Sequence, residues 1–104
     1  MAKYLLAYKG GGMPQTDAER EAVMAAWGAW FQGLGKAVVD MGNPIGASSS
    51  VSANGSVQNG GTSGLTGYSI LSADDLGKAV ELAKGCPVLT RGGSVEVYET
   101  FEVM

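Results

Sequence analysis

The sequence contains no histidine and only one cysteine among its 104 residues. Without an imidazole, the chain cannot build a Ser-His-Asp triad, a Cys/His zinc site or a histidine acid or base. Cys86 has no second cysteine with which to form a disulfide within the chain. The sequence therefore predicts no metal site, and no motif in it requires a cofactor.

Positive charge is also scarce, since 7 Lys and Arg stand against 10 Asp and Glu, for a formal charge of −3. No basic cluster is present, so neither nucleic acid nor an anionic membrane surface is an expected partner. Residues 41–73 carry no charge at all, but they are mostly Ser, Gly, Asn and Thr and cannot span a bilayer. The apolar run from Tyr4 to Tyr8 is too short for a signal-peptide core, which favours a cytoplasmic protein.

The length is typical of one domain, residues 1–104, that can bury a core without disulfides. Residues 3–9 are apolar at both odd and even positions, which predicts a central strand covered on both faces. Thr16 and Glu19 form a capping box that opens a helix running to about Asp40. The buried stripe of this helix is expected to comprise Val23, Trp27, Trp30, Phe31, Leu34 and Val38. Its internal glycines indicate either a strained helix or a close approach to a neighbour.

The uncharged middle of the chain predicts an irregular hairpin within residues 46–64 rather than disorder. Residues 45–52 are typical of a weak strand, and Asn54-Gly55 favours a two-residue turn that pairs Val51 with Val57. A clear strand follows over residues 65–72.

A second helix is predicted after Ser72, which would act as its N-cap and be followed by two aspartates in the first turn. Gly85 and Pro87 end it. Its buried face is expected to consist of Leu76, Ala79, Val80 and Ala83.

Residues 94–103 alternate between apolar and polar side chains, which predicts the last strand. Val95, Val97, Phe101 and Val103 fall on one face, and Glu96, Tyr98, Thr100 and Glu102 fall on the other. Glu99 interrupts the apolar face, which indicates a bulge, a strand end or a functional carboxylate.

The predicted order is strand, helix, hairpin, strand, helix, strand. This order is typical of an α+β, ferredoxin-like split βαβ fold, in which an antiparallel sheet carries both helices on one face. The other face is left open, and a second copy of the chain would cover its apolar side chains. The sequence therefore predicts a homodimer.

Three segments, residues 67–76, 79–87 and 92–97, resemble the YCII-related family of small dimeric α+β barrel proteins. The first strand, the Trp-containing helix and Gly42-Asn43-Pro44 match more loosely. The resemblance implies a ferredoxin-like fold, pairing through the open sheet faces and a cleft beside the sheet.

The better-studied branch of this family resembles enzymes that have a histidine on the first helix and a nearby aspartate. One branch is linked to dehydrochlorination of hydroxylated aromatics. The position of that histidine falls near Ala26 or Trp27 in this chain, and no other histidine replaces it. A histidine-dependent mechanism therefore does not carry over.

The candidate catalytic residues are Glu96 and Tyr98. Glu96 could meet phenols from the neighbouring strands, at Tyr4, Tyr8 and Tyr68, and it would transfer protons if burial raised its pKa toward neutrality. The alternative is that this face is solvated or lies in the dimer interface, with the tyrosines acting as packing groups.

The candidate ligand-binding residues are Arg91, Trp27, Tyr68 and Tyr8. Arg91 could anchor a carboxylate or phosphate, or it could pair with the partner subunit on the surface. Trp27 belongs to the core stripe but could line the cleft.

The triple glycine at residues 10–12 favours a flexible turn over an anion site. Cys86 follows a helix C-terminus, where the dipole disfavours a thiolate, so a packed thiol is favoured over a nucleophile.

Two functions remain open at this point. In the first, a dimer binds a small organic ligand in the cleft, and any lyase-like or isomerase-like proton transfer depends on Glu96 and Tyr98. In the second, the chain is a non-catalytic accessory or interaction module that has lost the family's catalytic histidine.

Overall fold

The computed structural model describes residues 2–12, 14–61 and 63–103. Its main sheet has four antiparallel strands in the spatial order β2-β5-β1-β6. These strands are β1 (Ala2–Lys9), β2 (Val38–Asp40), β5 (Leu65–Ala73) and β6 (Ser94–Glu99). A second sheet of two short strands, β3 and β4, stands apart from the first. The protein is thus an α+β fold, as the sequence predicts.

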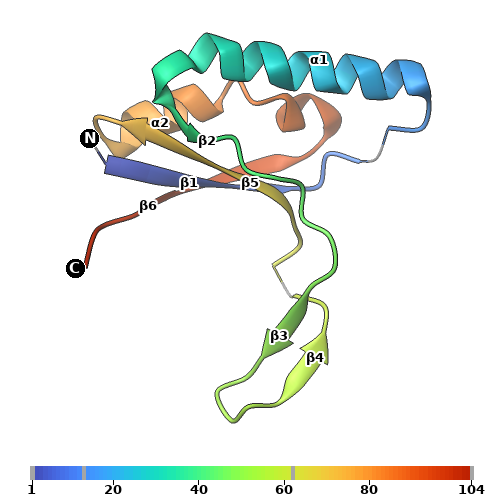
Figure 1. Cartoon of the computed structure of the whole chain (residues 1–104), viewed down its shortest axis with the longest axis vertical. Helices are drawn as coiled ribbons and strands as arrows, with labels where there is room; N and C mark the ends of the chain where they lie inside the picture. Colours follow the sequence, from blue (N-terminus) through green and yellow to red (C-terminus); the bar gives the residue numbers. More distant parts are fainter. Residues whose placement is uncertain (1, 13, 62, 104) are drawn as a thin grey trace.

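Two α-helices, α1 (Asp17–Leu34) and α2 (Leu76–Ala83), lie over the same face of the main sheet (Figure 1). A short 3-10 segment, η2 (Pro87–Arg91), follows α2 on that side. The core forms between these elements and the sheet, and its largest fully buried side chains include Tyr4, Leu6 and Leu71. No helix among the described residues lies on the opposite face of the sheet.

The first strand is central, which confirms the prediction from its apolar composition. β1 pairs with β5 on one side and with β6 on the other. Since successive strand residues point to opposite faces, Tyr4, Leu6 and Tyr8 face the helices, while Leu5 and Ala7 face the open side.

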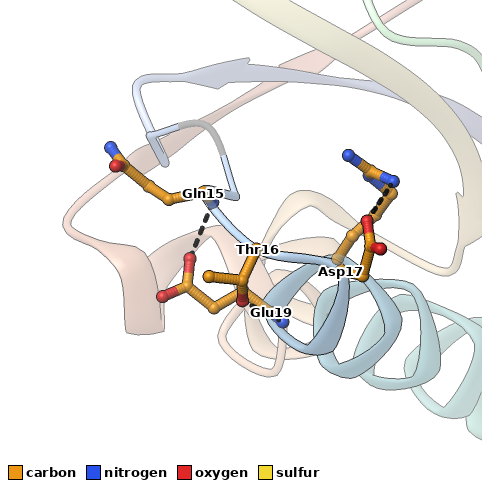
Figure 2. Close-up of polar contacts among 5 residues, drawn as sticks. Gln15, Thr16, Asp17 and Glu19 are labelled. Atoms are coloured by element: carbon orange, nitrogen blue, oxygen red, sulfur yellow. Dashed lines mark hydrogen bonds and ion pairs between the residues drawn. The ribbon is translucent and has the colours of Figure 1, made fainter.

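The start of α1 follows the predicted cap. The Thr16 side chain accepts a hydrogen bond from the Glu19 backbone N–H at 3.0 Å. Figure 2 shows the Glu19 carboxylate reaching back, but its partner is the backbone N–H of Gln15, at 2.7 Å, rather than that of Thr16. Asp17 adds an exposed ion pair with Arg20 at 3.1 Å, also drawn in Figure 2.

The end of α1 differs from the prediction. The helix stops at Leu34, because Gly35 adopts φ 57° and ψ −120°, a conformation that glycine tolerates and other residues do not. A 3-10 turn over Gly35–Ala37 follows, and Val38 opens β2 instead of continuing the helical stripe. The predicted extension to Asp40 is therefore wrong.

The internal glycines of α1 do not mark a close approach. A Cβ added at Gly28 or Gly33 would meet no atom within 4 Å. The prediction that these glycines allow a close approach to a neighbouring segment is therefore wrong at both positions.

The start of α2 also needs correction. Ser72 lies within β5, and Asp75 is the N-cap, with its side chain accepting from the Lys78 backbone N–H at 2.7 Å. The buried residues of the helix are Ala79 and Ala83, as predicted, whereas Leu76 and Val80 are exposed. The predicted buried face was thus only half right, because the helix is rotated so that Leu82 also packs on the core.

The hairpin consists of β3 (Ser49–Val51) and β4 (Val57–Asn59), and it extends away from the sheet on the side opposite the helices (Figure 1). Val51 pairs with Val57, as predicted. The loop between them is longer than a two-residue turn, because the Ser52 N–H donates to the Ser56 carbonyl at 2.8 Å. The strand predicted over residues 45–52 shrinks to the three residues of β3.

The last strand ends earlier than predicted. β6 stops at Glu99, and Phe101 and Val103 are 82% and 77% exposed beyond it. Their predicted place on the buried face is wrong, because the ladder between β6 and β1 ends at the pair Glu99 and Tyr4, and Thr100 makes the last backbone contact with β1, at the Lys3 carbonyl. Of the three explanations for Glu99, the strand end is the one observed.

Candidate functional site

A cavity of about 650 Å³ lies between α1 and the end of the sheet where β1 meets the glycine loop. Six segments form its wall: Tyr8 of β1, α1, residues 10–12, residues 41–44, residues 66–69 and η2. Small-molecule sites in proteins typically have volumes of about 300–1,000 Å³. The cavity is thus large enough for a small organic ligand.

The α1 side of the cavity is apolar. Its lining residues are Val23, Met24, Trp27 and Phe31. The Trp27 ring packs edge-on against Tyr8, with centroids 5.0 Å apart, and lies 5.9 Å from the Phe31 ring. The helical stripe predicted as core therefore serves a second purpose, because part of it faces the cavity.

The floor of the cavity is fixed by a buried hydrogen-bond chain. The Tyr8 hydroxyl donates to the Ser69 Oγ at 2.7 Å, and the Ser69 hydroxyl donates to the Met41 carbonyl at 2.7 Å. Burial raises the pKa of Tyr8 far above its ordinary value. The phenol therefore stays protonated and acts as a structural donor rather than as a base.

One wall depends on a close backbone contact at Gly42. This residue has φ 75°, and a Cβ there would lie 1.7 Å from the Tyr68 carbonyl oxygen. The Tyr68 N–H also donates to the Asn43 carbonyl at 3.4 Å, and Pro44 bridges to Gly67. These contacts hold residues 41–44 against β5 at the cavity edge.

Tyr68 borders the cavity, but its side chain has a different environment. Its strand neighbours Gly67 and Ser69 are buried on the helix side, so alternation directs the Tyr68 ring to the open face. The contribution of Tyr68 to the cavity wall is therefore mainly its backbone.

Arg91 is the single charged residue among the described residues that line the cavity. Its Nε–H donates to the Gly11 carbonyl at 2.8 Å, across the loop in which Gly10, Gly11 and Gly12 all have positive φ. Within the described residues no carboxylate lies within ion-pair distance of Arg91. The terminal nitrogens of its guanidinium are thus available to a ligand.

Glu96 and Tyr98 lie elsewhere. Both are on the open face of the sheet, where the Tyr98 hydroxyl donates to Glu96 at 2.7 Å and Lys9 approaches Glu96 at 3.5 Å. The hydrogen bond from Tyr98 lowers the pKa of Glu96, burial opposes this effect, and Lys9 lowers the pKa further. The rise in pKa that proton transfer would require is not observed.

The expected contact between Glu96 and the phenols of the neighbouring strands is also absent in the described residues. Tyr4 and Tyr8 point to the helix side, and the carboxylate that meets a phenol there is Glu99, whose Oε2 accepts from the Tyr4 hydroxyl at 3.4 Å. The structure thus brings Tyr8, Trp27 and Arg91 together around one cavity and leaves Glu96 and Tyr98 outside it.

Cys86 is a buried thiol. Burial raises its pKa to about 11, so the sulfur is neutral at physiological pH and cannot serve as a thiolate nucleophile. This observation agrees with the packed thiol that its position after a helix predicts.

Sequence reasoning missed Ser69 as a part of the site. A signal was present, since Ser69 occupies a helix-facing position of its strand between Gly67 and Leu71, where a polar residue needs a partner. The sequence alone could not name that partner, because Tyr8 and Met41 come from distant segments.

No protein-family model matches the chain, and a comparison with curated proteins gives no match either. None of the described helices is long and apolar enough to cross a membrane. Over the described ranges, no group of three or more Cys, Asp or Glu side chains could hold a metal ion.

Proposed function

We propose that this protein binds a small organic molecule in the cavity between α1 and the sheet, and that it does so as a homodimer of the YCII-related type. The observation that carries the proposal is the open, mostly apolar cavity of about 650 Å³ with one cationic side chain in its wall. A cavity of this kind stabilises no fold by itself, because its lining loses packing contacts. Binding is the function that accounts for it best.

The strand order supports a ferredoxin-like split βαβ arrangement. β1 lies between β5 and β6, and β2 pairs with the far side of β5, so each helix connects two strands that are not neighbours. The chain order of these six elements is β-α-β-β-α-β, with the hairpin inserted between β2 and β5.

The open sheet face supports the dimer. Residues paired across β5, β1 and β6 share a face, and the central rows of the open face contain Leu5, Ala7, Tyr68, Ile70 and Tyr98. Apolar side chains in adjoining rows form a surface that small proteins commonly cover with a partner. A second copy of the chain would cover this face in both subunits at once.

Proton transfer has weaker support than binding. Glu96 is paired with Tyr98 and Lys9, and neither Glu96 nor Tyr98 lines the cavity. A lyase-like or isomerase-like reaction would need these groups to face a ligand on the open side of the sheet. We therefore propose binding without assigning a reaction.

The alternative is a non-catalytic accessory module that binds no small molecule. The paired state of Glu96 and the absence of histidine favour it. The cavity does not favour it, because Trp27 and Tyr8 form part of the wall and leave the space open.

Native mass spectrometry of the gently purified protein tests both parts of the proposal. We expect a dimer that retains an additional small mass. Met24→Glu should abolish the retained mass, because Met24 lines the cavity yet is 68% exposed, so that the fold should tolerate the change. Ala25→Glu, with the same charge on an exposed neighbouring position, should retain it.

A matched pair of lysine variants also tests the proposed dimer. Ile70→Lys places a charge in the central row of the open face and should yield monomers, whereas Ala25→Lys on exposed α1 should leave the mass of the dimer unchanged. A wild-type protein that is monomeric would contradict the dimer. A protein that retains no small molecule, and whose cavity residues respond to no added ligand in NMR spectra, would favour the accessory module.

A further inference from the structure

The cavity has an unusual charge for this acidic chain. The whole protein carries a formal charge of −3, but the described residues of the cavity wall include Arg91 and no Asp, Glu or Lys. Arg91 is half-buried, and partial removal from water strengthens the attraction of a guanidinium for an anion. A cationic ligand would be repelled.

We propose that the ligand is an apolar monocarboxylate, with its carboxylate bound by Arg91 and its apolar body held against Trp27 and Phe31. This inference rests on the proposed binding function of the cavity and specifies the chemical class that it takes.

The geometry of Arg91 supports recognition of a carboxylate. Its Nε–H is already bound to the Gly11 carbonyl at 2.8 Å, which restricts the rotation of the side chain. The two terminal nitrogens are left to form a pair of parallel hydrogen bonds, the arrangement in which guanidinium binds carboxylate. Little side-chain entropy is then lost when the ligand binds.

A single cation favours one negative charge over two. Lys9 directly precedes the glycine loop of the cavity wall, but it contacts Glu96 on the open face of the sheet, at 3.5 Å. A phosphate monoester dianion would bring a second charge that no described lining residue neutralises. A buried charge without a partner is costly, so the monocarboxylate fits better.

The other polar groups of the wall favour an apolar body. The Tyr8 and Ser69 hydroxyls donate within the protein, and the Thr66 hydroxyl lies 3.3 Å from the Tyr8 carbonyl and 3.2 Å from the Gly10 carbonyl. With these three hydroxyls engaged, the Asn43 amide and Arg91 are the polar side chains left to a ligand among the described lining residues, too few for the several hydroxyls of a sugar or polyol. The rings of Trp27 and Phe31 instead suit an aromatic or branched aliphatic body.

A matched acid and amide test the inference. The probes are 2-naphthoate and 2-naphthamide, which share the apolar ring system and differ in the charged group, and binding is measured by isothermal titration calorimetry at neutral pH. We expect naphthoate to bind at least about tenfold more tightly than naphthamide, as for hydrogen bonds to a charged group. In Arg91→Gln this preference should vanish.

The ratio of the affinities for naphthoate and naphthamide separates a role of Arg91 in binding the carboxylate from a role in holding the glycine loop. Arg91→Gln also removes the bond to Gly11 and could weaken both probes equally, but only an anchoring role would remove the preference for the acid. Arg20→Gln is the control, because it removes the same charge from an exposed arginine outside the cavity. It should leave the preference unchanged.

The outcomes distinguish the two proposals. Equal affinity for both probes in the wild type would overturn the carboxylate inference and leave small-molecule binding standing. A preference that persists in Arg91→Gln, or that also disappears in Arg20→Gln, would overturn the role of Arg91. If neither probe binds at millimolar concentration, the carboxylate inference fails, and the retained mass in native mass spectrometry decides whether the proposed binding function fails with it.

Discussion

The Tyr8 hydroxyl donates a hydrogen bond of 2.7 Å to the Ser69 Oγ, and both residues are buried between the sheet and α1. Tyr8 lies on β1 and Ser69 on the adjacent β5, and the Ser69 hydroxyl in turn donates a hydrogen bond to the Met41 carbonyl. This relationship joins two central strands to the segment that forms one wall of the cavity. It therefore contributes both to stability and to the shape of the candidate site.

Removal of the Tyr8 hydroxyl should be costly. Tyr8→Phe keeps the ring against Trp27 but leaves Ser69 without its donor in a buried place, so we expect a loss of about 1–2 kcal/mol in the free energy of unfolding. Chemical denaturation measures it. Ser63→Ala is the control, because it removes an exposed hydroxyl that lies outside the sheet and makes no hydrogen bond within the described residues. Equal effects of the two changes would contradict the structural role of the buried pair.

A glycine within the first helix and the glycine that ends this helix should respond in opposite directions to substitution by alanine. Gly28→Ala adds a methyl group that meets nothing within 4 Å, so the higher helix propensity of alanine should stabilise the protein by up to about 1 kcal/mol. Gly35→Ala should destabilise it by more than about 1 kcal/mol, because φ 57° with ψ −120° is strained for alanine. Thermal unfolding of both variants checks the prediction. A gain in stability for Gly35→Ala would mean that the helix end differs from the one described.

The local signals of the sequence predicted the elements well but not their ends. Thr16 and Glu19 mark the start of α1 by short-range chemistry, and the apolar run of β1 marks a central strand. The periodic spacing of apolar residues continues through Val38, so it does not reveal that the helix ends before Gly35. A glycine within a helix and a glycine that ends one look the same in a sequence.

The candidate site was predicted in part for a similar reason. A helical stripe of apolar residues points to Trp27, and a positive charge without an acidic neighbour in the sequence points to Arg91. The fold brings both residues to one cavity. Strand alternation correctly placed Glu96 and Tyr98 on one face. Which face borders the cavity depends on how α1 lies over the sheet, and this is a long-range property that no local pattern contains.

Because the Cys86 thiol is buried, we expect the free energy of unfolding to fall at alkaline pH. The pKa of Cys86 is about 11 in the folded protein, above the value of about 8.5 expected for an unfolded chain. As the pH rises between these values, the unfolded state loses its proton first, so the free energy of unfolding falls. We expect the thiol to account for a loss of about 1–2 kcal/mol between about pH 8.5 and pH 10, and because tyrosines begin to ionise in the upper part of this range, a variant without the thiol isolates its contribution.

Denaturation at several pH values measures this slope, and Cys86→Ala is the matched variant. Alanine cannot ionise, so the variant should have a lower stability at neutral pH but a flatter profile above about pH 8.5. Thiol reagents should also label the native protein slowly and the unfolded protein quickly. Identical pH profiles for the two proteins would mean that the thiol is not held neutral by burial.

Glu96 offers a test of whether the open face takes part in binding at the cavity. Glu96→Gln removes a carboxylate that contacts Tyr98 and Lys9 but lies outside the cavity wall. We expect the affinity for 2-naphthoate to change by less than about twofold, because the carboxylate does not border the cavity. Calorimetry provides this value. A tenfold weaker affinity would connect the open face to the ligand and would return Glu96 to the candidate site as a proton-transfer group.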